Sequence, residues 1–227
     1  MYDPLTSRAI DFLWELSINN QRPWFQEHKE EYRRVLGHPF RSLAQETAGL
    51  MQARWPKYGF QPRISRIYRD ARRLFGRGPY HDHLWFSLQR MEAASRGPML
   101  WFELGLEGSS HGLGFWDQTA AQAEAFRRHM DRDLTRFERL VNGIPHREQS
   151  RLWGEEYKRP KGDRGELLNP WYNRRHLSVG YENFFGDRLF DRQLPELLAE
   201  SFSGLMPMYD FFLEVWAAEP GLAEEPR

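Results

Sequence analysis

A short alternating segment in the middle of the chain, residues 99–107 (MLWFELGLE), constrains the fold most. Every second position is apolar, and these positions are Leu100, Phe102, Leu104 and Leu106. Trp101, Glu103 and Glu107 fall between them. Because successive side chains of a strand point to opposite faces, this pattern predicts a half-buried strand. The chain must therefore build a sheet whose apolar face is buried and whose other face is polar.

Further strands are predicted on both sides of this segment. Residues 108–112 (GSSHG) favour a turn and residues 113–116 (LGFW) a returning strand, so 99–116 should form a hairpin. Residues 63–71 (RISRIYRDA) and 84–88 (LWFSL) also favour strands, and residues 176–182 (HLSVGYE) add one much later. Since strands from both halves of the chain must share one sheet, a single domain is expected.

The ends of the chain have the helical period instead. An apolar stripe predicts a first helix that starts at Thr6 or Ser7 and ends at Asn19-Asn20; a second should run from Pro23 to Gly37 and a third should follow Pro39. Residues 119–141 predict one helix, or two broken near Asp133. Residues 154–171 suggest a polar loop, and residues 194–217 a helix that Pro207 should kink.

These segments predict an α+β fold in one domain spanning residues 1–227. A mostly antiparallel sheet from the middle of the chain should pack against N-terminal and C-terminal helices. The core is expected over about residues 5–217, with a polar tail at 218–227.

Composition narrows the class of protein. The chain has 32 basic and 32 acidic residues, and this balance argues against a protein that coats polyanions. The absence of cysteine excludes disulfides and thiolate chemistry. The N-terminus lacks the pattern of a signal peptide, and no apolar run is long enough to cross a bilayer. We expect a soluble, cytoplasmic protein with no membrane association.

Residues 61–80 hold six arginines and one acid, Asp70. If residues 65–72 are a strand, one face is polar and consists of Arg66, Tyr68, Asp70 and Arg72. The other face is smaller and more apolar, and consists of Ser65, Ile67, Arg69 and Ala71. This second face should meet the core, so Arg69 on it would need a buried carboxylate or an opening in the sheet.

Two interpretations of the arginine segment stay open. In the first it is an anion site, because the guanidinium fork matches phosphate or carboxylate. Arg66, Arg69 and Arg72 would neutralise charge, Tyr68 and Tyr80 would orient the ligand, and Asp70 would fix an arginine or act as a general base. In the second it is an Arg–Asp–Arg ladder across strands, closed by Glu103 or Glu107.

Three other motifs could contribute to a site. Asn20 and Trp24 would line a pocket, although helix capping and core packing are favoured for them. Lys158 and Arg159 lie in a basic loop that would act as a lid if it folded over the arginines. The His81 and His83 pair, with His111 as a third ligand, has a spacing that is common by chance, so we predict no metal site. No cofactor-binding fingerprint is present.

The motif order FLWELSINNQRPWF, RIYRDAR, GPY, WFELGLEGSSHGLGFW and YKRP resembles the bacterial and fungal family called domain of unknown function 2461. The resemblance runs from about Phe12 to about Trp216 and implies a single α+β domain without an assigned activity. The positions that coincide with the family's signature are Asn19, Asn20, Trp24, Phe25, Arg66, Tyr68, Arg69, Asp70, Arg72, Tyr80, Lys158, Arg159 and Pro160.

The chain departs from the family pattern after the second motif. Family members continue with F-S-K-D-K-x-P-Y-K, whereas this chain has RLFGRGPYHDH. Lysines are thus replaced, with His81 at the last of these positions. The departure disfavours lysine-based chemistry such as a Schiff base, and it disfavours His81 as a metal ligand.

The leading hypothesis is a pocket that binds a phosphorylated or carboxylated small molecule. One alternative is a nucleic-acid binding module in which Tyr68, Phe75 and Tyr80 stack on bases, ranked lower because the net charge is zero. Another is an interaction scaffold that uses exposed Trp101 and Trp116 together with a structural salt-bridge network. The sequence assigns no reaction, substrate or oligomeric state.

Overall fold

The computed structural model describes residues 2–74, 76–90, 97–115 and 118–218 of the chain. It confirms the predicted α+β class, with a six-stranded antiparallel sheet. The strands are β1 (Phe60–Ile64), β2 (Leu84–Arg90), β3 (Pro98–Gly105), β4 (Gly108–Phe115), β5 (Arg151–Trp153) and β6 (Ser178–Glu182). Their order in the sheet is β1-β2-β3-β4-β6-β5, so the late strand β6 lies between β4 of the central hairpin and β5.

Helices come before and after the central strands, as predicted. The N-terminal ones are α1 (Ser7–Ile18), α2 (Arg22–Glu27), α3 (Lys29–Tyr32), the π-helical turn η1 (Arg33–Gly37) and α4 (His38–Arg54). The later ones are α5 (Ala120–Arg132), α6 (Leu134–Asn142), α7 (Gly165–Tyr172) and α8 (Leu194–Ala217). The break between α5 and α6 falls at Asp133, where its carboxylate accepts a hydrogen bond from the Arg136 N–H at 2.8 Å.

The chain divides into two compact units. The first consists of residues 1–88, 101–110 and 182–199, and the second of residues 89–100, 111–181 and 200–227. Strands β2, β3, β4 and β6 contribute residues to both units. The expectation of a single domain therefore stays a prediction.

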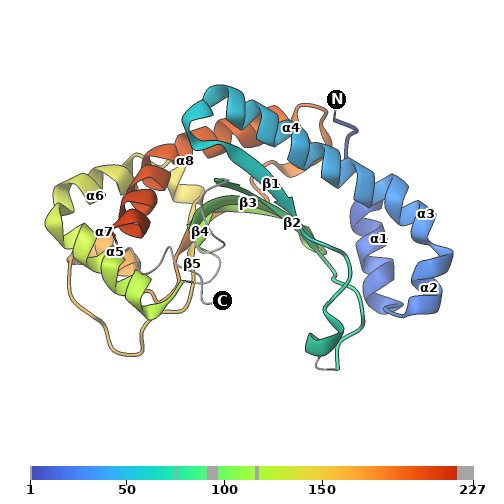
Figure 1. Ribbon diagram of the computed structural model, residues 1–227, viewed down its shortest axis with the longest axis horizontal. Helices are drawn as coiled ribbons and strands as arrows, with labels where there is room; N and C mark the ends of the chain where they lie inside the picture. The colour runs from blue at the N-terminus through green and yellow to red at the C-terminus, as the bar shows by residue number, and fades with distance from the viewer. Residues whose placement is uncertain (1, 75, 91–96, 116–117, 219–227) are drawn as a thin grey trace. The chain divides into compact units, whose positions relative to one another are not determined.

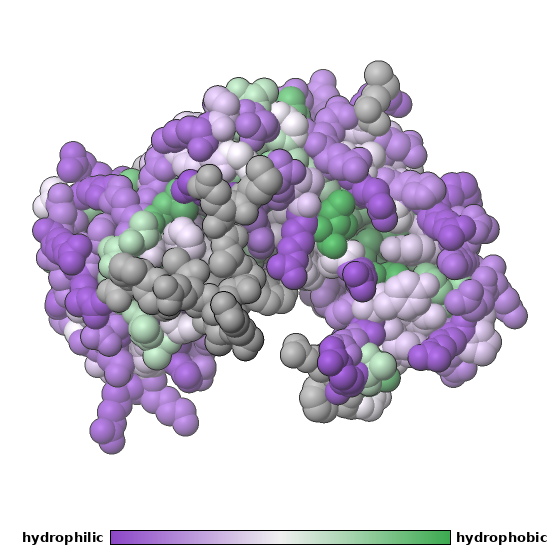
Figure 2. All heavy atoms as spheres, viewed as in Figure 1, coloured by the Kyte–Doolittle hydropathy of each residue, from purple (hydrophilic) through white to green (hydrophobic). Residues whose placement is uncertain are grey.

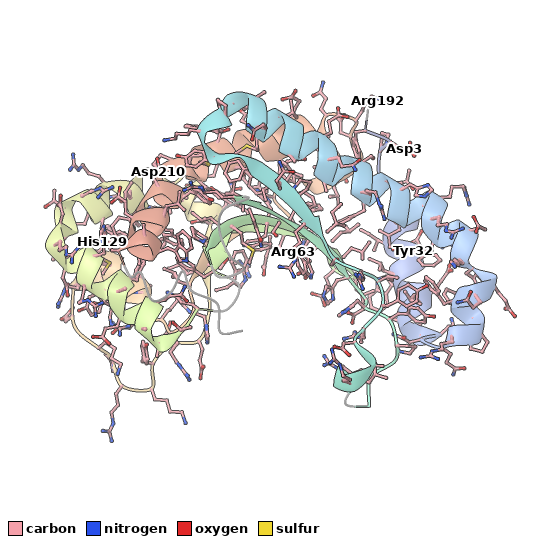
Figure 3. The ribbon with its side chains drawn as sticks, in the orientation of Figure 1. Asp3, Tyr32, Arg63, His129, Arg192 and Asp210 are labelled. Atoms are coloured by element: carbon pink, nitrogen blue, oxygen red, sulfur yellow. The ribbon has the colours of Figure 1, made fainter. Side chains whose placement is uncertain are left out.

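In the first unit, helix α4 lies against one face of β1 and its neighbours. Phe40 of α4 contacts Phe86 of β2 and Phe102 of β3, with ring centroids 5.8 and 6.0 Å apart, and all three rings are fully buried. Phe60 of β1 is also buried, whereas Arg63 is exposed and points away from α4 (Figure 3). This face supplies the hydrophobic burial that fixes α4.

In the second unit, an aromatic cluster joins the helices to β4. Phe126 of α5 contacts Phe137 of α6 and Phe211 of α8 edge to face, and Phe115 of β4 stacks on Phe212 at 5.1 Å. Trp171 of α7 adds an edge contact to Phe137 at 5.5 Å. These aromatic rings form the hydrophobic core of the second unit, because large rings bury much area per residue.

Two predictions about strands were wrong. The predicted strand over 63–71 ends at Ile64; the following residues form a loop with a 3₁₀ turn, η3 (Ala71–Arg73). The predicted turn at 108–112 belongs to β4, and the hairpin turns at Leu106-Glu107 instead, just before Gly108 with φ 116°. The GSSHG composition favoured a turn, but a left-handed glycine at its first position closes the hairpin two residues earlier than predicted.

Two helical predictions also need correction. Gly37 does not end a helix, since its backbone is helical (φ −65°, ψ −46°) and the chain continues directly into α4. Residues 154–171 are not all loop, because α7 begins at Gly165 despite containing Pro170. The short strand β5 was not predicted. It pairs antiparallel with β6, and a three-residue strand is too short to show a period.

Two expectations fall on residues outside the described part of the chain: the exposure of Trp116 and the conformation of the tail over 219–227. Trp101 is half-buried rather than exposed. Within the described residues, no helix combines the length and the apolar character that crossing a bilayer requires.

Candidate functional site

The arginine segment forms the loop that connects β1 to β2 (Figure 1). Hydrogen bonds hold this loop in place, and we call it the pinned loop. Tyr68 and Tyr80 form an isolated antiparallel bridge. Beside it the Arg69 N–H donates to the Pro79 carbonyl at 2.8 Å, and the His81 N–H donates to the Ile67 carbonyl at 2.7 Å. The loop therefore has a two-stranded neck, which fixes the position of its side chains.

Side chains within the first unit hold the neck in place. The Asn20 amide makes two hydrogen bonds of 3.0 Å, one to the Tyr80 carbonyl and one from the Tyr80 N–H. Arg69 Nε donates to the same carbonyl at 2.7 Å, and Arg69 Nη2 lies 3.3 Å from Asp82 Oδ1. The Arg69 side chain is only 11% exposed. Its partner carboxylate is not the buried one that was predicted, because the Asp82 side chain is 42% exposed.

Alternation of exposure survives in the loop although the strand does not. Arg66, Tyr68 and Asp70 are exposed, whereas Ile67 is buried and Arg69 largely so. Asp70 accepts hydrogen bonds from Arg72 Nε and Nη2 at 3.1 and 2.8 Å, and this pairing raises the pKa of Arg72. Of the predicted salt-bridge network the structure contains the Asp70–Arg72 pair, whereas the Arg69–Asp82 pair was not predicted.

A cavity of about 640 Å³ lies beside this loop. Its residues come from α2, α3, η1, α4, β1 and the start of the loop. They are Phe25, Lys29, Tyr32, Arg33, Gly37, His38, Arg41, Pro62, Ile64, Ser65, Arg66, Ile67 and Tyr68. We call it the basic pocket, because five of its lining side chains are basic and none is acidic.

Three cations of the basic pocket have no ion-pair partner in the part of the chain that the structure describes. Among the described residues, Lys29, Arg41 and Arg66 make no ion pair, whereas Arg33 is paired with Glu30. Like charges gathered around one cavity repel each other, and an anion in the cavity relieves that repulsion. The pocket therefore has an electrostatic preference for negative charge.

Aromatic rings form the other wall of the basic pocket. Phe25 is fully buried and contacts Tyr32 at 5.3 Å and Tyr68 at 5.6 Å between ring centroids. Burial raises the pKa of Tyr32 to about 12. Its phenol is a neutral donor at pH 7, as an ordinary tyrosine is. Tyr32 lies between α1 and α3 (Figure 3). Its ring rests 3.2 Å from where a Cβ at Gly37 would stand, so glycine makes room for it.

Surface polarity on this unit is mixed. On the face drawn in Figure 2, apolar surface shows between hydrophilic side chains over the end that holds α1, α2 and α3. Tyr68 is 47% exposed and belongs to a small set of large apolar side chains in the described chain with that much exposure. A half-exposed ring at the edge of a basic cavity can contact a ligand directly.

The structure brings only part of the predicted set together. Arg66 and Tyr68 line the basic pocket, whereas Arg69, Asp70, Arg72 and Tyr80 are not among its lining residues. Tyr80 is instead buried and stacks on Phe25 at 4.2 Å. Phe75, which was predicted to stack on bases, lies outside the described residues. Direct ligand contact by these residues stays a prediction.

The remaining candidates have other surroundings. Asn20 holds the neck of the loop, and Trp24 stacks on His28 with ring centroids 4.0 Å apart. Lys158 and Arg159 belong to the second unit, where with Tyr157 and His176 they line a cavity of about 370 Å³. Their expected role as a lid over the arginines stays untested.

The three histidines that were considered as metal ligands make other contacts. His81 and His83 lie edge to face at 5.2 Å, and His83 Nδ1 is 2.9 Å from Asp82 Oδ1. His111 lies in the second unit, fully buried, with Nε2 2.8 Å from Ser201 Oγ. Within the described ranges, no group of three or more His, Asp or Glu side chains is arranged to hold a metal ion.

Sequence reasoning missed Lys29, Tyr32 and Arg41. A signal was present, since positions 29, 33, 37 and 41 recur every four residues and all four line the basic pocket. In a straight α-helix this spacing drifts around the axis, which weakens the pattern. The π-helical turn at 33–37 takes more residues per turn and so keeps the four positions closer to one face.

The fold and the basic pocket define this chain as an α+β protein with a cationic, aromatic-lined cavity. Its sequence matches the family described as conserved hypothetical protein (DUF2461) over residues 8–211. The chain therefore belongs to this family, as the motif order predicted. A comparison with curated proteins gave no match.

Proposed function

We propose that the basic pocket binds an anionic small molecule that carries a phosphate or carboxylate group. The observation that carries the proposal is the charge of the lining: Lys29, Arg41 and Arg66 have no ion pair among the described residues, and no acidic side chain lines the cavity. Arg66 and Arg41 would donate hydrogen bonds to the anion from their guanidinium groups, and Lys29 would add a third cation. The size, about 640 Å³, is that of a small-molecule site.

The pinned loop supports this function by presenting Arg66 and Tyr68 in a fixed position. Arg69, Asn20 and the Tyr68–Tyr80 bridge hold the loop, so less conformational freedom is lost when a ligand binds. In this proposal Arg69 is a positioning residue, whereas Arg66 and Tyr68 contact the ligand. The pocket defines no reaction, and arginines of this kind suit binding as well as electrostatic stabilisation of a reacting anion.

Thermal shift of the purified chain against phosphate, sulfate, nucleotides, sugar phosphates, dicarboxylates and short oligonucleotides tests the proposal. A ligand at about a hundred times its Kd adds roughly 2.7 kcal/mol, which raises the Tm by about 5–11 °C for a chain of this size. The rise should disappear in Arg66→Ala. It should persist in Arg72→Ala, which removes an arginine six positions away that is 89% exposed and paired with Asp70.

Absence of any shift across the panel would overturn the proposal. A shift with oligonucleotides alone, lost steeply as salt is raised, would favour the nucleic-acid alternative instead. A shift that Arg66→Ala and Arg72→Ala weaken equally would place the anion outside the basic pocket.

A further inference from the structure

We propose that the ligand of the basic pocket is an aromatic phosphomonoester: a flat ring system that carries one terminal phosphate, as in a nucleoside monophosphate. This inference rests on the proposed function and narrows it to one class of ligand. Three features of the lining support it: the number of cations without a partner, the half-exposed ring of Tyr68, and the open phenol groups.

The charge of the lining favours phosphate over carboxylate. Lys29, Arg41 and Arg66 come from α3, α4 and the loop, and among the described residues none of them has an ion pair. A carboxylate supplies one negative charge, whereas a phosphomonoester supplies about 1.5 to 2 at pH 7 and three acceptor oxygens. Three cations from three separate elements can each bind a different oxygen of one phosphate, which a carboxylate with two oxygens cannot match.

The aromatic wall favours a ring over an aliphatic body. Tyr68 is 47% exposed, yet its ring is held by edge contact with Phe25 at 5.6 Å and by Tyr80 at 5.2 Å. The ring is therefore fixed before a ligand arrives, and its free surface is available for stacking. A flat ligand ring stacks on it without selecting a particular base, because every base has a π face.

The phenol groups add donors at the same cavity. Neither Tyr32 nor Tyr68 has a hydrogen-bond partner for its hydroxyl among the described residues. The Tyr32 hydroxyl is protonated at pH 7, as any phenol with an ordinary pKa is, and burial only raises that pKa further, to about 12. Two neutral donors and three cations in one cavity match a group rich in acceptor oxygens, which again describes phosphate rather than an amine or a neutral sugar.

Isothermal titration with four small probes tests the inference. Phenyl phosphate has an aromatic ring and a phosphate, and ribose 5-phosphate has the phosphate without an aromatic ring. Benzoate has the aromatic ring with a carboxylate, and phenol has the aromatic ring without an ionised group. Phenyl phosphate should bind roughly tenfold or more tightly than ribose 5-phosphate, since one stacked aromatic ring contributes about that factor. It should also bind more tightly than benzoate, because benzoate keeps the ring but brings less negative charge and one acceptor oxygen fewer. Phenol should not bind measurably.

Variants connect this preference to the residues. Tyr68→Leu should bring the affinity for phenyl phosphate close to that for ribose 5-phosphate, while inorganic phosphate loses only the contribution of the Tyr68 hydroxyl, which Tyr68→Phe measures separately. Tyr68→Phe keeps the ring and should keep the preference. Trp14→Leu is the matched control, because Trp14 is a 49% exposed aromatic residue that does not line the basic pocket. Arg66→Ala should weaken every phosphate probe, and circular dichroism checks that each variant is folded.

The outcomes separate this inference from the proposed function. Equal binding of phenyl phosphate and ribose 5-phosphate, or tighter binding of benzoate, would overturn the aromatic phosphomonoester and leave the anion pocket standing. An unchanged preference in folded Tyr68→Leu would also overturn it, because the ring would then be recognised elsewhere. Absence of binding by every anionic probe and by inorganic phosphate would overturn both.

Discussion

Asn20 and Tyr80 are joined through both polar atoms of one side-chain amide. Asn20 Nδ2 donates to the Tyr80 carbonyl and Asn20 Oδ1 accepts from the Tyr80 N–H, each at 3.0 Å, across 60 positions of sequence. Gly78 allows this approach, since a Cβ there would overlap the Asn20 side chain. The turn between α1 and α2 therefore fixes the neck of the arginine segment, on which the proposed pocket depends.

Asn20→Ala should lower the free energy of unfolding by about 1–3 kcal/mol, because the Tyr80 N–H loses its acceptor and the Tyr80 carbonyl keeps only the hydrogen bond from Arg69 Nε. Urea unfolding followed by circular dichroism measures the loss. Gln21→Ala is the control, as Gln21 is exposed and makes no capping hydrogen bond, and it should change stability by less than about 0.5 kcal/mol. Equal effects of the two substitutions would show that the amide pair contributes nothing.

Arg69→Ala and Arg72→Ala should differ in stability although both remove an arginine from the same loop. Arg69 is 11% exposed and donates to the Tyr80 carbonyl and to Asp82, so its loss should cost about 1–3 kcal/mol. Arg72 is 89% exposed, and an exposed ion pair contributes little. The same urea titration compares them. A fully stable Arg69→Ala would mean that the loop keeps its neck without this side chain.

Gly180→Ala should be strongly destabilising. Strands β4 and β6 approach closely at Gly112 and Gly180, and a Cβ at 180 would overlap the backbone of His111 and Gly112. Overpacking of this kind costs about 1–3 kcal/mol or more, because backbone must move. Gly49→Ala is a contrasting control, since a Cβ on this α4 glycine meets nothing within 4 Å. It should stabilise the protein by about 0.5–1 kcal/mol. A lower Tm for Gly180→Ala and a higher one for Gly49→Ala confirm the prediction.

Much of the fold could be predicted because periodicity reports which face of an element is buried. The helix over 194–217 and the return of β6 to the sheet follow from spacing, whereas spacing left the break at Asp133 as one of two alternatives. The extent of the strand after Ile64 could not be predicted. Its alternation of exposure continues to Asp70, but the partners that sustain the pattern are side chains such as Asn20 and single backbone bonds rather than a strand.

The candidate site was harder to predict because its residues meet only in three dimensions. The arginine density of 61–80 pointed to a charged feature, and the structure divides those arginines into Arg66 at the cavity and Arg69 within the neck. That division depends on which carboxylate each guanidinium can reach, and Asp82 lies 13 positions from Arg69. Lys29 and Arg41 gave only a weak signal in the sequence, because they share a face through the π-helical turn between them and not through the α-helical period.

His111 should make the protein less stable as the pH falls below neutral. It is 1% exposed beside Ser201, and burial lowers its pKa to about 3 from an ordinary value of 6.5. Between these values the unfolded chain binds a proton that the folded chain excludes. His111 therefore does not lower the free energy of unfolding above about pH 6.5. Below that pH the free energy of unfolding falls by up to about 1.4 kcal/mol per pH unit as the pH drops toward 3.

Urea unfolding at several pH values between about 7.5 and 4.5 tests this slope against His111→Gln. At neutral pH the variant should be less stable than the natural chain, because the buried site loses its fitted ring. The gap should then narrow on acidification, since glutamine does not titrate. His38→Gln removes an exposed histidine and is the matched control for the loss of one imidazole. A gap that stays constant across this range would mean that His111 takes up its proton in the folded state, and that the buried ring is not held neutral.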